Sequence, residues 1–156
     1  MNPQRRLALA AAFVAACAAP GLPALGQAKP QVHETTVEGV TAEIVEAVRK
    51  EGVLTMKVRY RNESATPATL KLYRSWDDKD YYLTAGSTKL MVLKDSKGTP
   101  VAVPHSVHGT TDISIKPKGS FLFWAKFPAP HADAKKIAFS HPHSPPIEDI
   151  PVTDAK

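Results

Sequence analysis

Histidine is the residue type in this chain with the most potential for chemistry. The chain has six histidines, and two of them flank a single proline in His141-Pro142-His143. Residues two apart on an extended backbone point to the same side, so both imidazoles can approach one metal ion. His105 and His108 can add ligands from a neighbouring loop, which makes the four residues candidate ligands for Cu²⁺ or Zn²⁺. Such short spacings are equally typical of surface loops, and the loop interpretation is favoured.

Other reactive arrangements in the sequence are incomplete. Asp77, Asp78 and Asp80 share part of the spacing of a calcium-binding EF-hand loop, but the glycine and final glutamate of that loop are missing. A solvated acidic turn is therefore expected there. No serine lies in the Gly-x-Ser-x-Gly elbow that presents the nucleophile of many hydrolases. The sequence predicts a protein that is not an enzyme and that uses no cofactor.

A group of aromatic residues is the candidate for a partner-binding surface. Tyr73, Trp76 and the pair Tyr81-Tyr82 lie close together in the sequence, near the cation Arg74. Aromatic and arginine side chains are enriched in protein interfaces. Because successive side chains of a strand point to opposite faces, about half of this group must point outward. We therefore predict that Tyr73 and Tyr81 or Tyr82 contribute to a partner surface.

The first 28 residues have the features of an export signal. Arg5 and Arg6 supply the positive charge, an apolar run extends from Leu7 to Ala19, and small residues precede candidate cleavage points after Gly26 and Ala28. The run is shorter than the roughly 20 apolar residues that span a bilayer. The sequence therefore predicts a bacterial protein that is periplasmic or secreted.

Cys17 allows a second interpretation of the same signal. The residues Val14-Ala15-Ala16-Cys17 resemble the lipobox of bacterial lipoproteins, in which the cysteine is diacylated and residues 1–16 are removed. The protein would then be an outer-membrane lipoprotein, attached to the membrane only through Cys17. The residues that follow are apolar, whereas a lipoprotein tether is usually polar. Soluble export is therefore favoured, with Cys17 as a small apolar residue of the signal.

Composition limits the remaining possibilities. The formal net charge is +5, of which Arg5 and Arg6 contribute two, and no long run of like charge occurs. A nucleic-acid partner is therefore not expected. Cys17 is the only cysteine, so no disulfide can form within the chain. Because this cysteine lies in the predicted export signal, cysteine-ligated zinc and blue-copper sites are not expected in the mature domain.

The body of the sequence is typical of β-structure. Leu54, Met56, Val58 and Tyr60 alternate with polar residues, as expected of a half-buried strand. The segment 121–127 alternates in the same way, with Phe121, Phe123, Ala125 and Phe127 on one face; the other face is mixed. The segment 40–48 fits a helix or a strand, and a strand is favoured because all that follows is β. A hairpin is expected at 95–98, with Gly98 at positive φ.

These patterns predict an all-β protein of seven to nine short strands, folded as an immunoglobulin-like antiparallel β-sandwich. A signal peptide is expected at 1–28, a flexible lead-in at 29–39, the sandwich at 40–152 and a tail at 153–156. The segment 147–152 is interrupted by Pro151 and is expected to be an edge strand.

Four segments carry a resemblance to a known group: 52–62, 94–98, 115–120 and 121–128. They resemble the DUF4352-type, telokin-like exported bacterial immunoglobulin-like domains, and a secreted mycobacterial antigen of the MPT63 type is similar in architecture. The run 123–130 also resembles uncharacterised envelope proteins associated with OmpA-like domains. The resemblance covers about residues 40–152 and implies a fold without catalytic residues. The chain lacks the inter-sheet cysteine pair of antibody domains, so Trp76 or Trp124 is expected to fill that space.

Together these observations predict a non-enzymatic binding or structural module of the bacterial cell envelope. Its expected partner is an envelope protein or a cell-wall component. The alternative is a periplasmic protein that binds copper or zinc through His105, His108, His141 and His143. Fold alone does not decide between them.

Overall fold

The computed structural model describes residues 31–72, 81–103, 111–142 and 144–155. Over these ranges the chain forms twelve strands and no helix, so none of the described residues belongs to a helix that could span a membrane. The expected β-sandwich is confirmed. The strands exceed the expected seven to nine because several contain only two to four residues, too few to leave an alternating pattern in the sequence.

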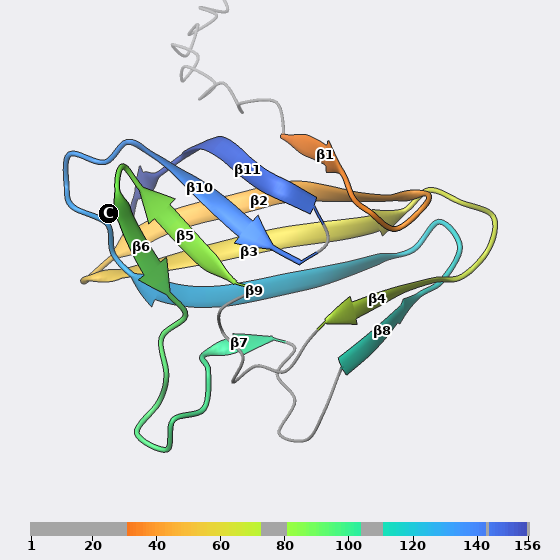
Figure 1. Cartoon of the computed structure of the whole chain (residues 1–156), viewed down its shortest axis with the longest axis horizontal. Coiled ribbons are helices and arrows are strands. Elements are labelled where there is room, and N and C mark those ends of the chain that lie inside the picture. Colours follow the sequence, from red (N-terminus) through yellow and green to blue (C-terminus); the bar gives the residue numbers. More distant parts are fainter. Residues whose placement is uncertain (1–30, 73–80, 104–110, 143, 156) are drawn as a thin grey trace, which may run out of the picture.

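The strands form three sheets (Figure 1). The large sheet contains, in order, β1 (Val32–Glu34), β2 (Val40–Lys50), β3 (Val53–Asn62), β9 (Ser120–Pro128) and β7 (Ala102–Val103), and β12 (Thr153–Asp154) pairs with β2. The four-stranded sheet contains, in order, β11 (Ser144–Pro151), β10 (Lys136–His141), β5 (Tyr82–Ala85) and β6 (Thr88–Met91). The two-stranded sheet pairs β4 (Ala68–Leu72) with β8 (Thr111–Ile115). Among the described strands, only β12 pairs in parallel.

The two strongest sequence patterns are confirmed as β3 and β9. These strands pair antiparallel over nine positions, from Val53 opposite Pro128 to Arg61 opposite Ser120. Residues directly opposite each other point to the same side of a sheet. Val58 therefore meets Phe123 on the inward face, and both are buried. The strand interpretation of 40–48 is also confirmed, since these residues form most of β2.

Tight turns set the register of these long strands. β2 and β3 are joined by the two residues Glu51 and Gly52, whose φ angles of 50° and 78° are those of a type I′ hairpin turn. This turn places Lys50 opposite Val53 and aligns the strands from there. A bulge between Ile44 and Glu46 then shifts the pairing by one residue. Gly98 has a φ of 78°, as expected of the turn at 95–98.

The ends of the described chain are more regular than expected. The segment 29–39 was expected to be a flexible lead-in, but residues 32–34 form β1 and pair with residues 41–43 of β2. The segment 153–156 was expected to be a tail, but Thr153 and Asp154 form β12 beside Val48 and Arg49. Both expectations were wrong. The short strands form because their backbone groups pair with the edge of β2, and a local sequence pattern does not reveal this pairing. The edge position of β11 is confirmed.

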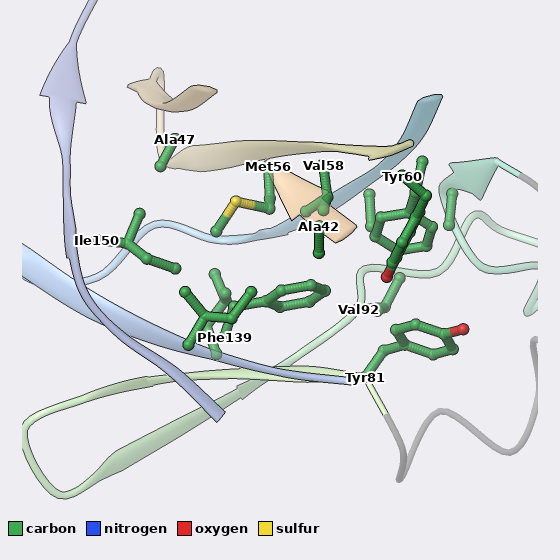
Figure 2. Close-up of a cluster of buried hydrophobic side chains, with 14 of the residues drawn as sticks. Ala42, Ala47, Met56, Val58, Tyr60, Tyr81, Val92, Phe139 and Ile150 are labelled. Carbon is green, nitrogen blue, oxygen red and sulfur yellow. The ribbon is translucent and has the colours of Figure 1, made fainter. Parts of the chain in front are cut away.

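The core lies between the large sheet and the four-stranded sheet, as Figure 2 shows. Its largest fully buried side chains include Tyr60, Phe127 and Phe139. Phe139 stacks on Phe123 and meets the edge of Phe127, with centroids 6.0 and 6.5 Å apart. Trp76 or Trp124 was expected to fill the inter-sheet space. Trp76 lies outside the described residues, and Trp124 points to the opposite face of β9, on the same side as Lys57 of β3. Phenylalanine and tyrosine rings occupy that space instead.

Candidate interaction surface

Three of the four large apolar side chains that are exposed in the described part of the chain, Val32, Val103 and Leu122, lie on the side of the large sheet that faces away from the core. Val32 is 57% exposed, Leu122 41%, Val45 38% and Val103 36%. Val45 lies at the bulge of β2, between Ile44, which packs against the core, and Glu46, which points outward. Single exposed apolar residues are normal on a protein surface, but neighbouring ones mark an interaction site, and Leu122, Trp124 and Val103 are neighbours on β9 and β7.

Strand register shows how this side is organised. Val32, Glu43, Arg59 and Leu122 lie opposite one another on β1, β2, β3 and β9 and form one row. Glu46, Lys57, Trp124 and Val103 form a parallel row on β2, β3, β9 and β7. We call these eight residues the outer face. Each row has an acidic residue on β2, a cation on β3 and an apolar residue on β9.

Ion pairs neutralise the centre of the outer face. Glu43 accepts hydrogen bonds from Arg59 and Arg61, both at 3.1 Å, and Lys57 lies 2.9 Å from Glu46. Partial burial opposes ionisation of Glu43, but the bonds and charges of Arg61 and Arg59 outweigh it and lower the pKa of the carboxyl group. The face is therefore charged but nearly balanced, which reduces the cost of removing it from water.

Of the tyrosines predicted to form a partner surface, the two that the structure describes do not share an exposed face. Tyr81 is 7% exposed and stacks on Phe123 in the core, with centroids 5.2 Å apart, so its assignment to a surface was wrong. Tyr82 points the other way and is half-buried, with the Lys89 ammonium group 3.6 Å above its ring. Tyr73 lies outside the described residues.

The structure buries His141, one of the four proposed metal ligands. His141 is 3% exposed and stacks on Phe139, with centroids 5.3 Å apart. Its Nδ1 lies 3.0 Å from the Tyr60 hydroxyl and its Nε2 lies 2.5 Å from Ser144 Oγ. Both ring nitrogens are therefore engaged, and the assignment of His141 as a metal ligand was wrong. His105, His108 and His143 lie outside the described residues.

The hydrogen-bond partners of His141 fit the tautomer with the proton on Nε2. Burial, with a contribution from Tyr81, raises the pKa of the Tyr60 hydroxyl well above its usual value, so this group keeps its proton and can donate it to Nδ1. With Nδ1 as the acceptor, Nε2 donates to Ser144, whose hydroxyl donates to the Pro145 carbonyl at 2.7 Å. The contact between His141 and Ser144 joins the two strands of the β10–β11 hairpin.

A surface cavity of about 330 Å³ lies beside the β1–β2 connection. Its lining includes three carboxylates, Glu34, Glu38 and Glu63. In the described ranges, however, no group of three or more histidine, cysteine, aspartate or glutamate side chains is arranged to hold a metal ion. The cavity is therefore an acidic surface hollow, and the outer face is the stronger candidate site.

Leu122 and Trp124 were not predicted to be functional surface residues. Both alternate with Phe121, Phe123 and Ala125, so the period of β9 already placed them on the face away from the core. Leu122 and Trp124 lie beside Arg59 and Lys57 because β3 pairs with β9, and the sequence patterns did not predict this pairing.

No family model matches the chain, and no curated protein or solved structure shows significant similarity to it. The likeness to exported immunoglobulin-like domains therefore stays a prediction.

Proposed function

We propose that this protein is a non-enzymatic binding or structural module of the bacterial cell envelope. It is exported by its first 28 residues and contacts an envelope protein through the outer face. The observation that carries the proposal is that Val32, Val103 and Leu122 are exposed on one side of the large sheet, with Leu122 and Val103 next to Trp124. An apolar concentration with polar neighbours is typical of protein interaction sites.

The geometry of the outer face suits association with a protein. Trp124 lies between Lys57 and Val103, so an aromatic anchor has a cation on one side and an apolar neighbour on the other. Tryptophan and arginine are the residues that most often dominate binding energy in protein interfaces. Because β2, β3 and β9 are long and continuously paired, little backbone freedom remains to be lost on binding.

Crosslinking in isolated envelopes tests the proposed surface. We expect the Trp124→Ala/Leu122→Ala variant to give several-fold less crosslinked product than the wild type. Tyr82→Ala, on the other sheet, is the matched control and should crosslink normally. Circular dichroism of both variants checks that the fold is retained. Loss of crosslinking with Tyr82→Ala, and not with the outer-face variant, would overturn the proposed surface.

The intact mass of protein extracted from the envelope tests the proposed export. A chain that begins at Gln27 or Lys29 identifies a free periplasmic or secreted protein. A chain that begins at Cys17 and carries a diacylglycerol identifies a lipoprotein. A mass that includes Met1 to Ala28 would contradict export through a cleaved signal.

A further inference from the structure

We infer that the partner of the outer face is a second copy of this chain, bound face to face about a twofold axis. This inference rests on the proposed function, since it names the partner of the surface proposed above. It follows from the order of residue types across the sheet. The row Val32, Glu43, Arg59, Leu122 reads apolar, acidic, basic, apolar, and it is complementary to itself when reversed.

In a twofold homodimer, this order of residue types makes the two facing surfaces complementary. In a twofold interface the same patch serves both subunits, so a contact from residue i to residue j is repeated from j to i. An axis parallel to the strands, between β2 and β3, reverses the order of strands in the facing copy. Val32 then faces Leu122 of the second copy, and Glu43 faces Arg59 of the second copy. Apolar side chains meet apolar ones and each charge meets its opposite.

The second row repeats the charged part of this order. Glu46 and Lys57 lie on the same two strands as Glu43 and Arg59, and they form an ion pair of their own at 2.9 Å. The same axis sets Glu46 opposite Lys57 of the second copy. Packed sheets cross at about 30°, so register is kept best near the axis. The four charged residues lie on the two strands that flank the axis, where the match is closest.

The charge order favours a second copy over an unrelated protein. Burying one member of an ion pair against an apolar surface is costly, because the charge loses water and gains no new partner. Each carboxylate of the outer face is next to a cation on its own chain and meets another across the axis. An unrelated partner would need to supply the same alternation of charge in the same register.

Substitutions at Val32 and Leu122 test the proposed dimer and leave the ion pairs within each chain intact. Val32 and Leu122 lie on β1 and β9, separated by β2 and β3, so they do not contact each other within one chain. We expect the wild type to sediment as a dimer at concentrations of about 100 μM, as a modest interface allows. Val32→Asp alone and Leu122→Lys alone should each weaken dimerisation at least about tenfold, because each leaves two unpaired charges in the interface.

An equal mixture of the two variants should recover the dimer. In that heterodimer Asp at position 32 faces Lys at position 122 across one junction, and Val32 faces Leu122 at the other. Neither variant alone can form this combination. Tyr82→Ala should dimerise like the wild type.

A monomeric wild type, or a mixture no more dimeric than its components, would overturn the inference. The crosslinking experiment distinguishes this result from failure of the proposed function. If the chain is monomeric but crosslinking still depends on Trp124 and Leu122, the outer face binds another protein. If crosslinking is also unchanged, the proposed function fails as well.

Discussion

Arg49 and Asp154 form a two-point ion pair that joins β2 to β12. The Nε–Oδ1 distance is 2.6 Å and the Nη2–Oδ2 distance is 3.1 Å. The guanidinium group also donates to the carbonyl groups of Pro130, His131 and Ala132, at 3.2, 2.7 and 3.2 Å. One side chain thus holds the loop after β9 and the strand β12 against β2, with the planar fork of donors that suits several acceptors.

We predict that Arg49→Ala lowers stability more than Asp154→Asn. The first change removes the donor of three backbone carbonyls and a carboxylate, whereas the second removes one partner among four. Arg49→Lys should be intermediate, because a lysine ammonium group cannot reproduce the planar geometry. Urea denaturation of the three variants gives the order of midpoints. Equal midpoints for Arg49→Ala and Asp154→Asn would show that the carbonyl contacts contribute nothing.

Acidification should destabilise the protein through two carboxyl groups. The hydrogen bond from Arg49 lowers the pKa of Asp154, and Arg61 and Arg59 lower that of Glu43 against the opposing effect of burial. A depressed folded-state pKa gives stability that is present at neutral pH and is lost as the pH falls through that value. We expect the unfolding free energy to fall below about pH 4. The variant Glu43→Gln/Asp154→Asn should show a shallower decrease between pH 7 and pH 2, and an unchanged slope would contradict this assignment.

The buried contact between Tyr60 and His141 should be costly to break. Tyr60→Phe leaves Nδ1 of His141 without its donor at a buried site, which costs about 1–3 kcal/mol. Tyr82→Phe is the control and should change stability by less than about 0.5 kcal/mol. In a double-mutant cycle with His141→Phe, the combined loss should be smaller than the sum of the single losses, because the second change removes the group left unsatisfied by the first. Additive losses would show that the two residues do not interact.

The backbone at Gly39 offers a second test of the packing. Gly39 has a φ of +70°, and a Cβ there would lie 2.9 Å from Cβ of Ser64. Gly86 has a φ of +59° with nothing within 4 Å of its Cβ position. Gly86→Ala should therefore cost only the backbone strain of about 1 kcal/mol. Gly39→Ala should cost about 1–3 kcal/mol more, because Ser64 must move. Equal losses in thermal unfolding would contradict the close approach.

Metal titration separates the proposed function from the alternative suggested by the histidines. With His141 engaged by Tyr60 and Ser144, we expect Zn²⁺ and Cu²⁺ to leave the thermal midpoint unchanged. A ligand present at 100 times its dissociation constant would stabilise the protein by about 2.7 kcal/mol. A clear rise that disappears in His105→Ala/His108→Ala/His143→Ala would favour the alternative.

The parts of the fold that sequence analysis predicted are those with a strong period of two. β3 and β9 are long, each has one apolar face, and their inward residues were identified correctly. β1 and β12 were missed because they are two or three residues long and contain few apolar side chains. Both strands form by pairing with β2, and no local sequence pattern predicts that pairing.

The site was harder to predict than the fold for two physical reasons. When two adjacent residues are of the same type, as Tyr81 and Tyr82 are, the sequence does not reveal which side chain points inward. The strand that follows, β5, is only four residues long, so its alternation is too short to decide. His141 shares the phase of Ile137 and Phe139, which places it in the core, but the His-Pro-His spacing suggested a loop. The outer face required the register of five strands, and only the structure supplies it.

The two short strands beside β2 have a consequence for solubility. β2 is eleven residues long, and the edge that does not face β3 is covered by β1 near one end and by β12 near the other. An uncovered strand edge exposes unpaired amide and carbonyl groups, which recruit other chains into aggregates. Each short strand therefore shields part of this edge, and removing residues 153–156 should make the protein prone to aggregate even if its core remains folded.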